Sequence, residues 1–267
     1  MRIGIVHYVN SRPLSRGLLG AGGGDWICEL LPPAVIADRL RDGSLDVGLV
    51  PSIELARIPG LLVVPGLAIA ATHEVRSVLL VSQVPVAEIR SVALDENSRT
   101  SAALVRILLA ERYGIEPEYR PARADLGAML AVADAALLIG DPALAVPREQ
   151  YVVLDLAGEW LELTGLPFVF AVWAARAEAA PRIPAGIFAA SLATGLAQLD
   201  AIVGETAAET GLSEAVLRDY FTRNLSFRMG PAEQAGLAEY LRRAARAGLA
   251  PAGGPLEFLP VAVSGAG

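Results

Sequence analysis

Short apolar runs alternate along this chain with segments in which apolar residues recur every three or four positions. The runs predict buried strands, the clearest of which are 2–6, 45–51, 91–94 and 135–139. The recurring patterns predict amphipathic helices, the clearest of which are 33–40, 100–112, 187–203 and 231–248. Strands and helices that alternate in this way are typical of α/β proteins.

The alternation falls into two blocks. Apparent crossovers between the blocks lie near 82–90 and 168–174, which predicts two α/β lobes joined by a two-stranded hinge. The first lobe would combine residues 1–87 with 172–267, and the second would comprise 88–171. In open α/β sheets, ligands bind outside the carboxyl ends of the strands. A binding site is therefore expected in a cleft between the lobes.

A polar loop follows the predicted strand 91–94 and begins the next helix. It contains Ser98, Arg99, Thr100 and Ser101. The first turn of a helix has unpaired N–H groups and the positive end of the helix dipole, which suit a carboxylate or phosphate. Ser98 or Thr100 could serve only as a helix cap, whereas Arg99 beside free N–H groups makes a two-point anion clamp plausible. We take this loop as half of a predicted binding site.

Polar residues also stand where other predicted strands begin or end, at Asn10, Ser11, Ser52, Ser77 and Asp141. The carboxyl ends of neighbouring strands meet at one edge of a sheet, so these side chains are candidates for the other half of the site. Each has a plainer alternative as a helix cap or a solvated surface group. The pattern leaves both roles open.

Composition restricts the partners. The chain has 22 basic and 29 acidic residues, net −7, and no basic cluster longer than Arg242-Arg243, which argues against nucleic acid or an anionic membrane. The two histidines, His7 and His73, lack metal-ligand spacing, so no metal site is predicted. No glycine-rich nucleotide-binding motif occurs either.

Targeting features point to the cytoplasm. No apolar run of about 18 residues is free of charges and breakers, so we predict no transmembrane helix. Residues 1–6 look like a first strand rather than a secretory leader. The single cysteine, Cys28, excludes an internal disulfide and fits a reducing compartment.

Several stretches, taken together, resemble the chorismate dehydratase family of the futalosine route to menaquinone. They lie within about the first 175 residues, at 2–14, 45–55, 98–101, 137–144 and 163–173. A sister family with the same fold, the 1,4-dihydroxy-6-naphthoate synthases, typically opens with a Ser-Pro-Cys-Pro-Asn-Asp-Thr-like stretch. This chain has Tyr8-Val-Asn-Ser-Arg-Pro13 instead, which favours the dehydratases.

The resemblance implies a two-lobed α/β fold like that of the type II periplasmic binding proteins, with a mixed sheet in each lobe and a ligand cleft between the lobes. It implies a hydro-lyase that eliminates water from chorismate to give 3-[(1-carboxyvinyl)oxy]benzoate, without a metal, flavin or nucleotide cofactor. Asn10 and Ser77 would then act in catalysis. The residues expected to bind the substrate are Ser11, Ser52, Ser98, Arg99, Thr100, Ser101 and Asp141.

The sequence does not identify the general base. Asp141, Glu159 and His73 are candidates, and the side-chain carboxylate of the substrate could take the proton instead. Two other functions also stay open, the sister naphthoate synthase and a non-catalytic intracellular solute-binding protein. We expect a small anionic substrate as the partner and a monomer or weak homodimer.

Overall fold

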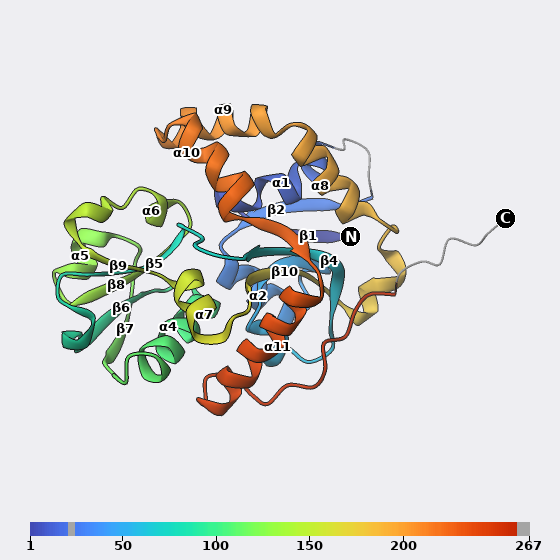
Figure 1. Ribbon diagram of the computed structural model, residues 1–267. Helices are drawn as coiled ribbons and strands as arrows, with labels where there is room; N and C mark the ends of the chain where they lie inside the picture. The colour runs from blue at the N-terminus through green and yellow to red at the C-terminus, as the bar shows by residue number, and fades with distance from the viewer. Residues whose placement is uncertain (21–24, 261–267) are drawn as a thin grey trace.

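The computed structural model describes residues 1–20 and 25–260, which form two mixed β-sheets flanked by helices (Figure 1). The first sheet has the strand order β11-β4-β10-β3-β1-β2, and the second has the order β7-β6-β8-β5-β9. The strands of the first sheet are β1 (Arg2–Val6), β2 (Ile27–Leu31), β3 (Val47–Pro51), β4 (Leu61–Ala71), β10 (Phe168–Arg176) and β11 (Ser226–Met229). Those of the second sheet are β5 (Val78–Ser82), β6 (Ser91–Asp95), β7 (Glu118–Ala122), β8 (Ala135–Ile139) and β9 (Val152–Asp155).

We call each sheet with its helices a lobe. The helices of the first lobe are α1 (Arg12–Gly20), α2 (Pro33–Arg41), α3 (Glu54–Arg57), α8 (Ile187–Ala197), α9 (Leu199–Thr210), α10 (Glu214–Asp219) and α11 (Pro231–Arg246). Those of the second lobe are α4 (Arg99–Glu111), α5 (Leu126–Leu130), α6 (Asp141–Leu144) and α7 (Leu156–Thr164). Short turns of other helical types are η1 (Val9–Ser11), η2 (Val86–Glu88), η3 (Arg148–Gln150), η4 (Ala177–Arg182) and η5 (Tyr220–Asn224).

The chain passes between the lobes slightly earlier than the sequence indicates. Strand β5 pairs with β8 and β9, so the first passage lies between Ala71 and Val78 rather than near 82–90. The return lies between Thr164 and Phe168, because all of β10 pairs within the first sheet. A fully buried strand such as β5 has the same apolar pattern in either sheet, so the pattern alone does not reveal which sheet it joins.

Three further differences from the predicted elements have local causes. The segment 61–71 is one strand rather than two, because the irregularity in its pairing with β10 accommodates Gly66, which has a φ of +77°. The predicted helix 187–203 is two helices, α8 and α9, bent by 73°. Strand β11 interrupts the C-terminal region that the pattern predicts as helical. Among the described residues no single helix is long and apolar enough to cross a bilayer, although the bent α8–α9 pair has the length and composition.

One hydrophobic cluster runs through both lobes. Beside the hinge, Trp160 of α7 packs edge-on against Phe168 of β10 and Tyr240 of α11, with ring centroids 5.4 and 6.2 Å apart. The Tyr240 hydroxyl donates a hydrogen bond of 2.8 Å to the carbonyl of Thr100, at the start of α4. The shared core therefore holds the first turn of α4 against the first lobe.

Candidate active site

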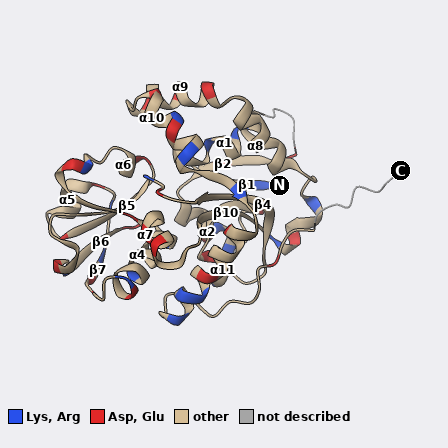
Figure 2. Cartoon of the chain, viewed as in Figure 1, with Lys and Arg blue, Asp and Glu red and all other residues tan. Residues whose placement is uncertain are grey.

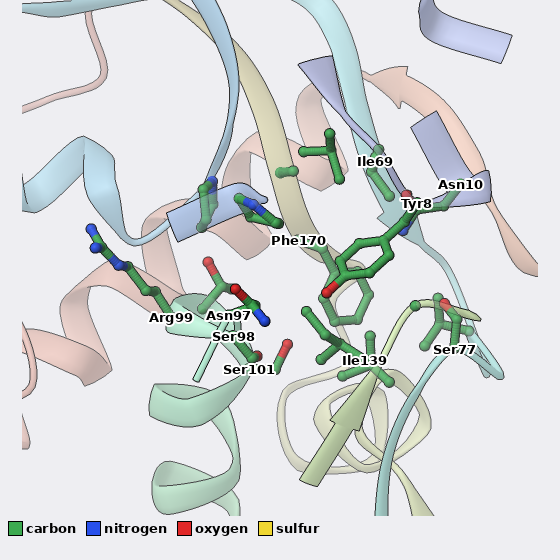
Figure 3. A pocket seen from close by; sticks show the side chains of 18 residues that line it. Tyr8, Asn10, Ile69, Ser77, Asn97, Ser98, Arg99, Ser101, Ile139 and Phe170 are labelled. Carbon is green, nitrogen blue, oxygen red and sulfur yellow. The ribbon is translucent and has the colours of Figure 1, made fainter. Parts of the chain in front are cut away.

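A cavity of about 550 Å³, counting its open mouth, lies between the lobes (Figure 3). Its polar walls come from the segment after β1, the connector 72–77 and the first turn of α4. These segments meet because each stands at a strand end that faces the other lobe. The predicted site residues that line the cavity are Asn10, Ser77, Ser98, Arg99, Thr100 and Ser101.

The first turn of α4 presents unpaired polar groups to this cavity. Ser98 occupies the N-cap position with an extended backbone, but its side chain makes no capping hydrogen bond. Its buried Oγ atom has no hydrogen-bond partner among the described residues. The neighbouring Ser101 is also buried and lines the cavity. An anion placed here would meet hydroxyl donors and the positive end of a 13-residue helix.

Arg99 lines the cavity, and its guanidinium is paired with carboxylates of the first lobe. One of its terminal nitrogens lies 2.8 and 2.9 Å from the two carboxylate oxygens of Asp38 in α2. The other lies 3.5 Å from Glu54, whose fully buried carboxylate also pairs with Arg41 and Arg57. Figure 3 shows the Arg99 side chain pointing away from the other labelled residues. Arg99 therefore links the two lobes in this structure.

Ser11, Ser52 and Asp141 lie outside the lining and support the main chain around it. The Ser11 hydroxyl donates to two backbone carbonyls, and the Ser52 hydroxyl donates to one at 2.7 Å. The Asp141 carboxylate accepts a hydrogen bond of 3.1 Å from the N–H of Val9, across the lobes. Burial raises the pKa of Asp141, and the Val9 N–H opposes that shift.

Ser77 is held by a residue that the sequence analysis missed. The hydroxyl of Tyr220 donates a hydrogen bond of 2.8 Å to Ser77 Oγ, and both side chains are buried. Tyr220 begins the turn η5, in the C-terminal third where no family motif was found. The side-chain oxygen of Asn10 is buried and has no hydrogen-bond partner within the described part of the chain.

Tyr8 is a second site residue that the sequence analysis did not single out, although it belongs to the quoted stretch 8–13. Its hydroxyl points toward the middle of the cavity, on the side of Asn97 and Ser101 (Figure 3). Burial raises the pKa of Tyr8, and the nearby carboxylates of Asp95 and Asp141 raise it further. The phenol therefore stays protonated and can donate a hydrogen bond to a ligand.

Comparison with known proteins identifies the family. A family model described as menaquinone biosynthesis matches residues 1–246. The chain belongs to this menaquinone biosynthesis family. A chorismate dehydratase of Thermus thermophilus is 29% identical over 259 residues, which cover 89% of this chain and 93% of that protein. The family suggested by the sequence stretches is thus confirmed.

Solved structures confirm the predicted fold class. A protein of Archaeoglobus fulgidus superposes with a TM-score of 0.72 at 13% identity, covering 93% of this chain and 97% of that one. The periplasmic aliphatic sulphonate binding protein of Escherichia coli gives a TM-score of 0.62 at 19% identity, covering 97% and 90%. A Candida albicans protein described as having the generic periplasmic binding protein fold gives 0.60 at 9% identity, covering 92% and 90%. At these identities the likeness shows the fold alone.

Two of the candidate bases of this menaquinone biosynthesis family member lie away from the cavity. Glu159 accepts a hydrogen bond of 2.6 Å from the Tyr113 hydroxyl and pairs with Arg112 at 2.7 Å. His73 is exposed and is not part of the lining. Among residues 1–20 and 25–260, no group of three or more His, Cys, Asp or Glu side chains is arranged to hold a metal ion.

The charges of this family member lie mostly outside the cavity. Figure 2 shows basic and acidic residues interspersed over the outer helices. Within the described part of the chain, Arg99 is the single charged residue that lines the cavity, and its guanidinium is already paired with Asp38. The cavity can therefore act on a ligand through uncharged hydrogen-bond donors and the first turn of α4.

Proposed function

We propose that this member of the menaquinone biosynthesis family is a chorismate dehydratase, a hydro-lyase that converts chorismate into 3-[(1-carboxyvinyl)oxy]benzoate and water. The observation that carries the proposal is the 29% identity to a named chorismate dehydratase over nearly the full length of both chains. The cavity supports it, because uncharged donors face one another there from both lobes.

The reaction requires little beyond orientation and hydrogen bonding. The ring carbon that bears the enol ether loses its proton, and the neighbouring carbon loses its hydroxyl, so one water leaves and the ring becomes aromatic. Donors aimed at the departing hydroxyl and at developing charge lower the barrier most in a water-poor cleft. We assign this role to Asn10 and Ser77, and we assign one substrate carboxylate to Ser98 and Ser101 in the first turn of α4.

We further propose that the substrate supplies the base. Among residues 1–20 and 25–260, those that line the cavity include no carboxylate or histidine. Asp141, the remaining protein candidate, lies outside the lining and already accepts the N–H of Val9. The side-chain carboxylate of chorismate lies beside the carbon that is deprotonated, so it can take the proton and pass it to the leaving hydroxyl. The Tyr8 hydroxyl would hydrogen-bond to a substrate carboxylate.

The experiment that tests the function is incubation of the purified protein with chorismate, followed by mass spectrometry. We expect catalytic formation of a product lighter by the mass of one water. Asn10→Ala and Ser77→Ala should each lower kcat by about 10²–10³. Binding of chorismate without turnover would favour a solute-binding protein. Conversion of cyclic dehypoxanthinyl futalosine instead would favour the sister naphthoate synthase.

Location and assembly stay predictions. We propose a cytoplasmic enzyme that is a monomer or a weak homodimer. Cell fractionation tests the location, and sedimentation at several protein concentrations tests the assembly.

A further inference from the structure

We propose that Tyr220 is a positioning residue for the dehydration, because its buried hydroxyl orients Ser77. This inference rests on the proposed function, in which Ser77 and Asn10 act on chorismate. Tyr220 lies in the C-terminal third of the chain, where the sequence contains no family motif.

The geometry at Ser77 is the first step. Tyr220 donates its hydrogen bond to Ser77 Oγ at 2.8 Å, so Ser77 accepts and its own proton remains free for another acceptor. Tyr220 is fully buried and Ser77 is 1% exposed, so water does not compete for this bond. Since Ser77 lines the cavity, its free proton can be directed at the substrate.

The second step concerns the side-chain amide of Asn10. Burial of the ring raises the pKa of the Tyr220 hydroxyl, and the side chains of Ser77 and then Asn10 lower it by smaller amounts. The hydroxyl therefore stays a neutral donor. Asn10 comes from the segment after β1, Ser77 from the connector and Tyr220 from the C-terminal region. The Tyr220 hydroxyl thus bonds to Ser77 and lies near Asn10, the two residues to which we assign catalysis.

The third step is the backbone that carries Tyr220. The turn η5 is a π-helix, in which the N–H of Leu225 donates to the carbonyl of Tyr220 at 3.0 Å, five residues back. Such turns are rare and occur frequently at functional sites. Within the same turn, Asn224 donates a hydrogen bond of 3.0 Å to the carbonyl of Glu74. The π-turn is therefore attached to the connector that carries Ser77.

The backbone of the connector is stabilised by a neighbouring carboxylate. Arg76, next to Ser77, has a φ of +65°, which is uncommon for a residue other than glycine. The buried carboxylate of Asp155 accepts the N–H groups of Val75 and Arg76 at 3.0 and 2.6 Å. Asp155 fixes the main chain before Ser77, and Tyr220 fixes the side chain of Ser77. Loss of the Tyr220 hydroxyl would leave the main chain in place and free the Ser77 side chain.

The test compares Tyr220→Phe with a matched control, Tyr113→Phe, in the chorismate assay. Tyr113 also donates its hydroxyl to a side chain, Glu159, but outside the cavity. We expect Y220F to lower kcat about tenfold to hundredfold with KM within about twofold, because a small misplacement of an orienting group is costly. Y113F should keep the wild-type kcat. A Y220F enzyme as fast as the wild type would overturn the proposal.

A double-variant cycle separates positioning from general damage. If Tyr220 acts through Ser77, the variant S77A/Y220F should be no more than about twofold slower than S77A, because residues that act as a unit are non-additive. Full multiplication of the two losses would show that Tyr220 acts elsewhere and would overturn the proposal. A wild-type protein that does not convert chorismate would instead refute the proposed function, and the inference would fall with it.

A second variant covers the case in which Y220F does not fold. Asn224→Ala removes the bond between the π-turn and the connector at a half-buried position that tolerates a smaller side chain. We expect kcat to fall several-fold while the thermal unfolding midpoint stays near that of the wild type. Wild-type kcat in a folded N224A protein, with Y220F unfolded, would count against the proposal, because the π-turn would then not control Ser77.

Discussion

Gly140 is the position at which a single methyl group should disturb the cavity most. It follows β8 with a φ of +65° and a ψ of −141°, a region that essentially only glycine adopts. A Cβ atom there would lie 2.8 Å from Cγ and 2.9 Å from Cδ1 of the Tyr8 ring. Both distances are well inside normal contact, and the ring is wedged between the lobes. Gly140→Ala should therefore strain the backbone and displace Tyr8.

The loss in the free energy of unfolding expected for Gly140→Ala has two parts. The backbone strain costs about 1–3 kcal/mol. Forcing a methyl group into a packed site costs about another 1–3 kcal/mol. Together these give a loss of about 2–6 kcal/mol in the free energy of unfolding, or on the order of 10 °C in the unfolding midpoint of a chain of this length. Displacement of Tyr8 should also raise KM for chorismate.

Urea and thermal unfolding of Gly140→Ala and of a control, Gly60→Ala, would separate the cost of backbone strain from the cost of the clash with Tyr8. Gly60 also has a positive φ, +74°, but a Cβ atom there would have no heavy atom within 4 Å. Gly60→Ala should lose only the backbone part, about 1–2 kcal/mol. Equal losses in the two variants would show that Tyr8 does not pack against Gly140 as the structure has it.

Two further predictions concern a hydroxyl and a carboxylate. Tyr8→Phe should raise KM for chorismate about tenfold, the loss expected for a hydrogen bond to a charged group. Its unfolding midpoint should stay near that of the wild type, because the ring that packs against Gly140 is retained. Glu239→Gln should weaken the acid sensitivity of folding. Hydrogen bonds from Arg242 and then Arg243 lower the pKa of Glu239 from 4.5 to about 2. Since the folded pKa is depressed, this stabilisation is present above about pH 4.5 and is lost as the pH falls toward about 2. Because the site is partly solvated, we expect about 1 kcal/mol.

The outcomes that would contradict these two predictions are specific. An unchanged KM in Tyr8→Phe would show that the phenol does not contact the substrate. For Glu239→Gln, urea unfolding at a series of pH values gives the difference in free energy from the wild type. A difference that stays constant from pH 7 to the acid limb would show that the two arginines do not depress the pKa of this carboxylate.

The parts of the fold that the sequence predicts are those with an uninterrupted local pattern. Strands β1 and β8 have the predicted bounds, since β8 is a buried apolar run of five residues and β1 has four buried residues after the exposed Arg2. Strand β2 was missed because it lies at the edge of its sheet, where Ile27 and Leu30 are 63% and 58% exposed and Glu29 interrupts the run. An edge strand lacks the burial pattern on which the prediction relies.

The site residues follow the same rule: those with a local sequence signal were predicted, and those that depend on tertiary contacts were not. Asn10, Ser77 and the loop before α4 were predicted because they stand at strand ends, which is a local feature. Tyr220 lies 143 residues from Ser77 and belongs to no repeating pattern, so only the folded chain brings it to the site. The partner of Arg99, Asp38, is likewise 61 residues away, and that pairing decides whether the guanidinium is free for a ligand.

Helix α4 also indicates how the cavity can open. At its first turn Arg99 is bonded to Asp38, and at its last turn Glu111 pairs with Arg243 and with Arg246 of α11. Both ends of α4 are therefore fixed to the first lobe. On the other side of the cavity, α6 meets the first lobe through the 3.1 Å hydrogen bond between the Val9 N–H and Asp141. A hinge motion that admits a ligand should separate the lobes where fewer polar contacts must break, on the α6 side. Opening on that side should move Gly140 away from Tyr8, whose ring lies against it, and should leave the first turn of α4 in place.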